Sequence, residues 1–296
     1  MQETWSEAAG YGGVRLSVRE IASEAGPGAP GLLLHHGLAS SQRIWDLMLP
    51  ALARRHRVVT FDARGHARSA KPSSGYGFEV TAADAVAVAR ATKLRRPVIV
   101  GHSWGAMVAL EVAVEHPNTT GGVVLIDGGV TRLRDSFSSW REARATLAPP
   151  QLAGLPVEEL RAKIPIFLSD AVAVTPAVEE IVLSVMRIGQ DGRIRPQLAH
   201  AHHFSILHAI WGQDPIALHG RLRVPGLALL AQPPRSVRGG GSDRSILEAK
   251  RAAARTIRAS GSPTRIEWVE GIHDLPLQHP QLLARRIQRF AATAVG

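Results

Sequence analysis

Residues 97–116 read PVIVGHSWGAMVALEVAVEH and contain the stretch on which the fold prediction rests. The apolar run 97–100 is typical of a buried strand, and the apolar spacing from Trp104 onward predicts a helix. Between them, GHSWG (101–105) fits the G-x-S-x-G pattern of a sharp strand-to-helix turn. Glycine at its two ends avoids the collision that side chains would cause in so tight a turn. We therefore predict that the turn exposes the hydroxyl of Ser103 above the end of a strand.

Short apolar runs followed by helical stretches recur on both sides of this turn. Predicted buried strands cover residues 31–34, 57–61, 97–100, 122–126, 226–231 and 265–269. Predicted helices cover residues 81–94, 104–116, 245–259 and 280–292, and residues 14–19 alternate like an antiparallel edge strand. Near-continuous apolar strands suit a parallel sheet that is covered on both faces. The sequence therefore predicts an α/β fold with a mostly parallel, doubly wound sheet.

This alternation stops between Thr131 and Arg221. The segment shows no convincing strand, and helical patterns cover residues 140–147, 157–163, 177–186 and 197–211. A stretch of about ninety residues is too long for a connecting loop. We therefore predict that residues 1–130 and 222–296 form the sheet domain and that residues 131–221 form an inserted, all-helical subdomain.

The composition of the 296 residues limits the classes of function. There is no cysteine, which excludes disulfides, thiolate metal sites and cysteine nucleophiles. The net charge is +10, but 31 of the 35 basic residues are arginines spread along the chain without an aromatic-interleaved basic stripe, so we expect no nucleic-acid partner. No secretory pattern opens the sequence, and no apolar run reaches the roughly 18 residues of a membrane span. We expect a soluble, cytoplasmic protein without a membrane partner, as a monomer or a homodimer.

With these motifs the sequence resembles the α/β-hydrolase family of capped serine hydrolases over nearly its whole length. His36-Gly37-Leu38 looks like the family's H-G-x loop, which implies that the backbone N–H of Leu38 joins that of Trp104 in an oxyanion hole. DARGHARS (62–69) looks like the family's D-x-R-G-x-G-x-S turn, with Ala67 in place of the second glycine, and we interpret it as structural. The insertion stands where family members carry a cap over the active site.

A serine hydroxyl is a weak nucleophile, so it needs a base within hydrogen-bond reach and a carboxylate that orients the base. GIHD (271–274) follows the last predicted strand, looks like the family's G-x-H loop and offers His273 as the base. His36 and His102 are interpreted as structural neighbours of the site. One helical stretch of the insertion carries four more histidines without visible carboxylate support for a metal site: His200, His202, His203 and His208.

The acid departs from the family's commonest pattern, which has an aspartate just after the strand predicted at 226–231. Here QPPRS (232–236) follows that strand, and the next acid is Asp243. Some family members use the end of the preceding strand, where this chain has Asp127. We predict Asp127 as the acid, although it could be a turn residue before two glycines. The alternatives are Asp243 first, and then Asp214, Glu270 and Asp274.

The resemblance implies acyl transfer through a covalent intermediate on Ser103, with no metal, nucleotide or organic cofactor. A serine in this turn argues against haloalkane dehalogenases and epoxide hydrolases, which use an aspartate there, and HHGLASS (35–41) differs from the HGGPG loop of prolyl iminopeptidases. We predict hydrolysis of small to medium carboxylic esters or lactones. Carbon–carbon bond hydrolysis of diketones and a receptor-like relative with little turnover are the alternatives. Candidate pocket walls, which could equally be core residues, are Trp104, Met107, Trp140, Phe167, Met186, Phe204 and Trp211.

Overall fold

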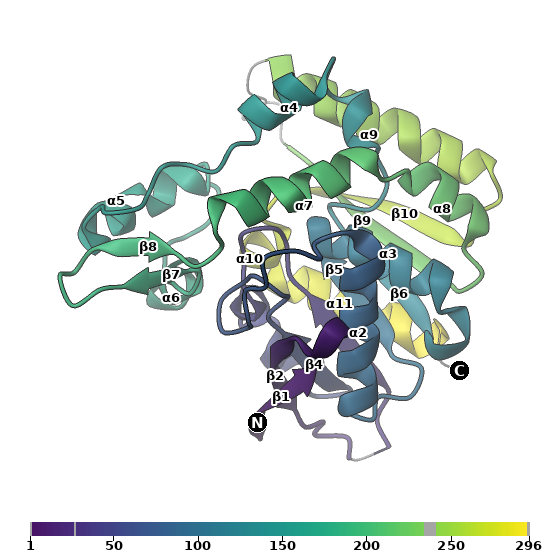
Figure 1. Cartoon of the computed structure of the whole chain (residues 1–296). Coiled ribbons are helices and arrows are strands. Elements are labelled where there is room, and N and C mark those ends of the chain that lie inside the picture. Colours follow the sequence, from purple (N-terminus) through teal and green to yellow (C-terminus); the bar gives the residue numbers. More distant parts are fainter. Residues whose placement is uncertain (1, 27, 234–240, 295–296) are drawn as a thin grey trace.

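The computed structural model describes residues 2–26, 28–233 and 241–294, with residues 241–243 described by their backbone alone. Its centre is an eight-stranded sheet in the order β1-β2-β4-β3-β5-β6-β9-β10 (Figure 1). The strands are β1 Glu3–Ala9, β2 Arg15–Ile21, β3 Gly31–His35, β4 Arg57–Phe61, β5 Val98–His102, β6 Gly122–Ile126, β9 Gly226–Gln232 and β10 Thr264–Glu270. Within this sheet β2 pairs antiparallel with β1 and β4, and the other pairs are parallel. The predicted mostly parallel α/β sheet is confirmed.

Helices cover both faces of this sheet and create two apolar cores. The first face is covered by α2 Phe78–Ala91, α3 Trp104–Glu115, α8 Pro215–Arg221 and α9 Gly241–Ala259. The second is covered by α1 Leu49–Leu52, α10 Leu275–Gln278 and α11 Pro280–Ala294. Alternate residues of one strand enter different cores: Ile99 lies in the first, and Val98 and Val100 lie in the second. This double burial explains why the central strands are apolar at almost every position.

Strand β1 escaped sequence-based prediction. Its sequence, ETWSEAA, is exposed at all positions but one, so it carries no alternating apolar signal. It is held instead by a seven-residue antiparallel register with β2, from Glu3 opposite Ile21 to Ala9 opposite Arg15. Backbone pairing at a sheet edge therefore decides its structure, and this pairing is invisible in the local sequence.

The segment between β6 and β9 contains helices and also a hairpin. Its main helices are α4 Trp140–Thr146, α5 Val157–Phe167, α6 Pro176–Leu183 and α7 His200–Gly212. The hairpin pairs β7 Met186–Ile188 antiparallel with β8 Ile194–Pro196, so the prediction of an all-helical insertion is wrong at this point. Its strands have three residues each and only Ile194 is buried, which leaves no periodicity to detect. In Figure 1, α5, α6 and the hairpin extend sideways from the sheet.

No helix within the described ranges is long and apolar enough to cross a membrane.

Candidate active site

The turn between β5 and α3 holds Ser103 in a strained conformation. Its backbone has φ +56° and ψ −120°, a combination that residues other than glycine rarely adopt. The Ser103 N–H donates to the carbonyl of Ile126 at 2.8 Å. A Cβ on Gly101 would lie 2.1 Å from the carbonyl oxygen of Gly105, and one on Gly105 would lie 2.2 Å from that of His35. Both positions therefore require glycine, because the neighbouring backbone lies too close for any Cβ atom.

Three side chains from separate loops meet at the carboxyl end of the parallel strands. Ser103 Oγ lies 2.9 Å from His273 Nε2, and His273 Nδ1 lies 2.6 Å from Asp127 Oδ2. Because Nδ1 faces a carboxylate, it carries the proton and leaves Nε2 free to accept from the serine hydroxyl. The structure thus brings together the predicted nucleophile, base and acid in an arrangement that can pass a proton from the hydroxyl to the imidazole.

The carboxylate of Asp127 is fully buried and satisfied on both oxygens. Its Oδ1 accepts from the Ala231 N–H at 2.8 Å and from Lys250 Nζ at 2.6 Å. Burial alone would raise the pKa of Asp127, but the Lys250 charge and the hydrogen bond with His273 outweigh it and hold the pKa below its usual range. Lys250 lies on α9, 123 positions after Asp127 in the chain, and no local sequence signal indicated that it would reach the site.

The loop that carries Asp127 packs directly against the serine turn. Asp127 has φ +44°, and its N–H donates to the Leu229 carbonyl at 2.9 Å. A Cβ on Gly128 would lie 2.2 Å from the carbonyl oxygen of Ser103, so only glycine allows this approach. The two glycines after Asp127, which could have marked an ordinary turn, therefore let a carboxylate lie beside the nucleophile.

None of the alternative acids has a described hydrogen bond to His273. Asp214 accepts from the Ala217 N–H at 3.1 Å and so caps α8. Glu270 is exposed at the end of β10, and Asp274 precedes α10 and lines the same cavity as Ser103. The side chain of Asp243 lies outside the described residues.

His273 itself is half-exposed, with 53% of its side chain accessible. Desolvation of the ring opposes its charged form, but the hydrogen bond and the charge of Asp127 outweigh this and raise the pKa of His273 above its ordinary value. Below it, His102 donates from Nε2 to the His273 carbonyl at 2.9 Å. Burial, followed by the charge of His273, lowers the pKa of His102 to about 4. His102 is therefore neutral near pH 7 and links the serine turn to the histidine loop.

The two predicted oxyanion donors come from separate segments, the loop after β3 and the start of α3. Leu38 and Trp104 both line the cavity that contains the serine, and neither N–H donates a hydrogen bond within the described part of the chain. The next amide, that of Ala39, donates to Nε2 of His66 at 3.2 Å, and the His66 ring stacks on Trp104 with centroids 5.4 Å apart. The arrangement leaves two backbone donors available for negative charge on a bound carbonyl.

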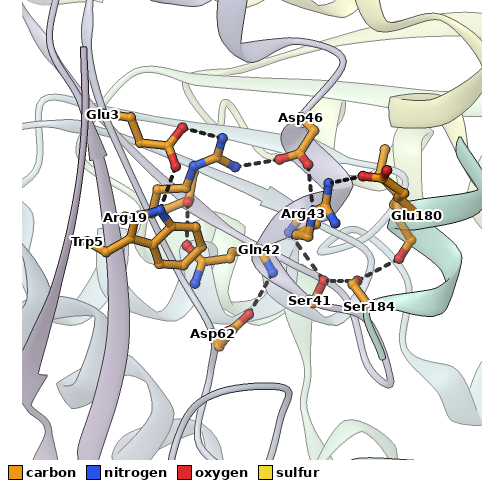
Figure 2. A network of polar contacts seen from close by, with 12 residues as sticks. Glu3, Trp5, Arg19, Ser41, Gln42, Arg43, Asp46, Asp62, Glu180 and Ser184 are labelled. Carbon is orange, nitrogen blue, oxygen red and sulfur yellow. Dashed lines mark hydrogen bonds and ion pairs between the residues drawn. The ribbon is translucent and has the colours of Figure 1, made fainter. Parts of the chain in front are cut away.

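Polar contacts fix the chain that follows Leu38 (Figure 2). The Gln42 N–H donates to Asp62 Oδ1 at 2.8 Å, within the turn that we interpreted as structural. On the other side, the hydroxyls of Ser41 and Ser184 lie 2.6 Å apart. Ser184 directly follows α6, so the network joins the predicted oxyanion loop to the insertion.

The same structural turn shows why an alanine can replace its second glycine. Ala67 has φ +34°, in the left-handed region that favours glycine. The turn is anchored by a buried ion pair of Arg64 Nε with Asp84 Oδ2 at 2.6 Å and by the Arg68 N–H, which donates to Asp62 at 3.2 Å. These contacts hold Ala67 in a left-handed conformation that is unfavourable for alanine.

Histidines elsewhere near the site make structural contacts. His36 donates to the Gly37 carbonyl at 2.8 Å and accepts from the Ala63 N–H at 3.0 Å, as expected for a structural neighbour. In the insertion, His202 bonds to the Tyr76 hydroxyl, and His203 to the Leu147 carbonyl. Among the described side chains, no three histidines or carboxylates are grouped as metal ligands.

A cavity of about 610 Å³ opens at Ser103 and His273, between the sheet and the insertion. A second, mostly apolar cavity of about 730 Å³ shares Phe167 and His203 with it. Of the predicted wall residues, Trp104 and Met107 line the first cavity and Met186 lines the second. Three others are absent from both linings: Trp140, Phe204 and Trp211.

Comparison with known proteins agrees with this architecture. Residues 30–155 match a family model described as the alpha/beta hydrolase fold. A 2-(acetamidomethylene)succinate hydrolase of Mesorhizobium japonicum is 32% identical over 116 residues, which cover 39% of this chain and 40% of that protein. The match thus spans less than half the length of this curated relative.

Solved structures match over nearly the whole chain. The crystal structure of E-2-(acetamidomethylene)succinate hydrolase has a TM-score of 0.77 at 20% identity and covers 98% of this chain and 100% of its own. The enol-lactonase from Burkholderia xenovorans has a TM-score of 0.65 at 17% identity, with 97% and 100% covered. Together with the family match, these structures show that the chain has the alpha/beta hydrolase fold.

Proposed function

We propose that the protein is a serine hydrolase that cleaves carboxylic esters or lactones of small to medium size. The observation that carries this proposal is the continuous hydrogen-bonded chain from Ser103 through His273 to Asp127, with distances of 2.9 and 2.6 Å. A hydroxyl with a base on one side, and a carboxylate behind that base, is the arrangement that acyl transfer needs.

The proposed reaction has two halves. As Ser103 Oγ attacks the carbonyl carbon, His273 Nε2 takes its proton, and the N–H groups of Leu38 and Trp104 bind the negative oxygen. The imidazolium, stabilised by Asp127, then gives the proton to the departing alkoxide, which leaves an acyl-enzyme. In the second half His273 takes a proton from water, the hydroxide attacks the ester, and the acid leaves as Ser103 recovers its proton.

The proposed size of the substrate follows from the cavities. Volumes of about 610 and 730 Å³ lie within the range that small-molecule sites usually have. We propose that the predicted insertion, residues 131–221, acts as a cap through the part that precedes α8, because Phe167 and His203 from this part line both cavities. An enol-lactonase among the structural neighbours supports the ester or lactone class.

The test is a panel of p-nitrophenyl esters of increasing chain length, several lactones and a 1,3-diketone. We expect ester or lactone turnover by the wild-type protein and an acylated protein detectable by mass spectrometry. A matched serine variant, Ser205→Ala, removes an exposed hydroxyl on α7 and should leave turnover unchanged. Cleavage of the diketone alone would contradict the ester proposal, and binding of ligands without any turnover would indicate a receptor-like protein.

A further inference from the structure

Lys250 is a charged residue of this site to which the mechanism above gives no task. Its Nζ lies 2.6 Å from Asp127 Oδ1, and only 15% of its side chain is exposed. The Ala231 N–H donates to the same oxygen at 2.8 Å, whereas His273 holds Oδ2. The carboxylate of Asp127 therefore has three described hydrogen-bond partners, and Lys250 is the only side-chain cation among them.

We propose that Lys250 is a positioning residue, which acts through Asp127 to set the orientation and the basicity of His273. The inference rests on the proposed function, because that function gives Asp127 and His273 their roles. It extends the site beyond the three loops to a further chain segment, the helix α9, which packs beside β10 on the first face of the sheet.

The residue type at this position fits the proposed role. The chain has 31 arginines and four lysines, and the other basic residues of α9 are Arg244, Arg251, Arg255 and Arg258. A guanidinium is a planar fork that engages two acceptors, whereas an ammonium is a compact charge that can approach a single oxygen. Because His273 occupies Oδ2, a point charge at Oδ1 suits this carboxylate better than a fork would.

The charges around His273 give the expected direction of the effect. The titratable groups facing it are Asp127, Asp274 and His102, with Lys250 beyond Asp127. Burial lowers the pKa of His273, Asp127 raises it, and Lys250 lowers it. Without Lys250 the imidazole should bind its proton more tightly, so more of it would be unable to accept the Ser103 proton near neutral pH.

The experiment compares Lys250→Met and Lys250→Arg with Arg255→Met, which removes an exposed positive charge from the same helix. The pH dependence of kcat and KM is measured on an ester from the panel, and the His273 ring is titrated by NMR. For Lys250→Met we expect two midpoints to move to higher pH: that of the rise in kcat on the acid side of the pH profile, and that of the His273 ring in the NMR titration. The plateau value of kcat should be about tenfold lower, and KM should be nearly unchanged. Lys250→Arg should keep the wild-type midpoint with partial kcat, and Arg255→Met should match wild type.

A double variant tests whether Lys250 works through Asp127. Residues that act as a unit are strongly non-additive, so Lys250→Met should change little in an Asp127→Asn background. A raised KM for anionic esters, with an unmoved pH midpoint, would make Lys250 a substrate anchor and overturn the proposal.

The two proposals can fail separately. If the wild type turns over no ester but the His273 titration still shifts in Lys250→Met, the proposed function fails and the coupling through Asp127 stands. If esters are hydrolysed but neither the titration nor the pH profile moves, the Lys250 inference is wrong. Lys250→Gln serves as the uncharged variant if circular dichroism shows that Lys250→Met is unfolded.

Discussion

The loops at the carboxyl edge of the sheet differ from the insertion between β6 and β9 in how closely their residues are packed. In the loops, backbone segments approach so closely that an added Cβ would lie 2.1–2.2 Å from a carbonyl oxygen at Gly101, Gly105 and Gly128. In the insertion, Ile166 is 70% exposed and Phe167 43%. The difference indicates that reactive groups require a rigid, closely packed frame, whereas the walls that select a substrate can be partly open to solvent.

The largest expected effect comes from the centre of the rigid region. Ser103→Ala should lower kcat for ester hydrolysis by roughly five to six powers of ten, because it removes the nucleophile. The unfolding midpoint should stay close to that of the wild type, because alanine keeps the Cβ and loses only a hydroxyl that lies beside the cavity. Steady-state kinetics and thermal unfolding measure the two quantities, and near-wild-type turnover would refute a serine mechanism.

The next effect identifies the acid. Asp127→Asn should lower kcat about 10⁴-fold, because an amide favours the wrong tautomer of the histidine. The matched variant Asp243→Asn should keep most of the activity. The reverse outcome, with loss at position 243 and retention at 127, would transfer the role of acid to Asp243.

Two glycine substitutions compare the regions directly. In Gly128→Ala the new Cβ meets the Ser103 carbonyl, so the loops must separate, and we expect about a 10²-fold loss in kcat. Gly212→Ala, at the end of α7 in the insertion, meets nothing within 4 Å and should leave kcat unchanged. Equal effects in the two variants would remove the distinction between a rigid and a tolerant region.

The smallest effect on activity is expected from Phe167, a residue that lines both cavities. Phe167→Ala joins the two cavities and should shift the preference for ester chain length by up to about tenfold. The kcat for the shortest ester should stay close to wild type. Chain-length profiles of kcat/KM provide the measurement, and an unchanged profile would show that Phe167 does not divide the binding space.

Much of the rigid region could be predicted because its signals are local. The strand, turn and helix around Ser103 lie within twenty consecutive residues, and two glycines mark the turn. Asp127 and His273 could be proposed because parallel strands bring their carboxyl ends to one edge, although the contact between the two residues spans 146 positions.

The remaining features depend on distant partners. Lys250 looks like one more basic residue on an amphipathic helix, and only the fold shows that it reaches Asp127. The hairpin β7–β8 has too few buried residues to create a pattern, and β1 is defined by its pairing with β2. Substrate preference depends on how insertion side chains point, which periodicity does not determine.

The central claim is that His273 makes the Ser103 hydroxyl reactive. A fluorophosphonate probe followed by intact-protein mass spectrometry measures this reactivity without a known substrate. We predict a single rapid adduct on Ser103 in the wild-type protein, with a labelling rate that falls by orders of magnitude in His273→Ala. Absence of an adduct at high probe concentration, or equal labelling rates in the two proteins, would contradict the account.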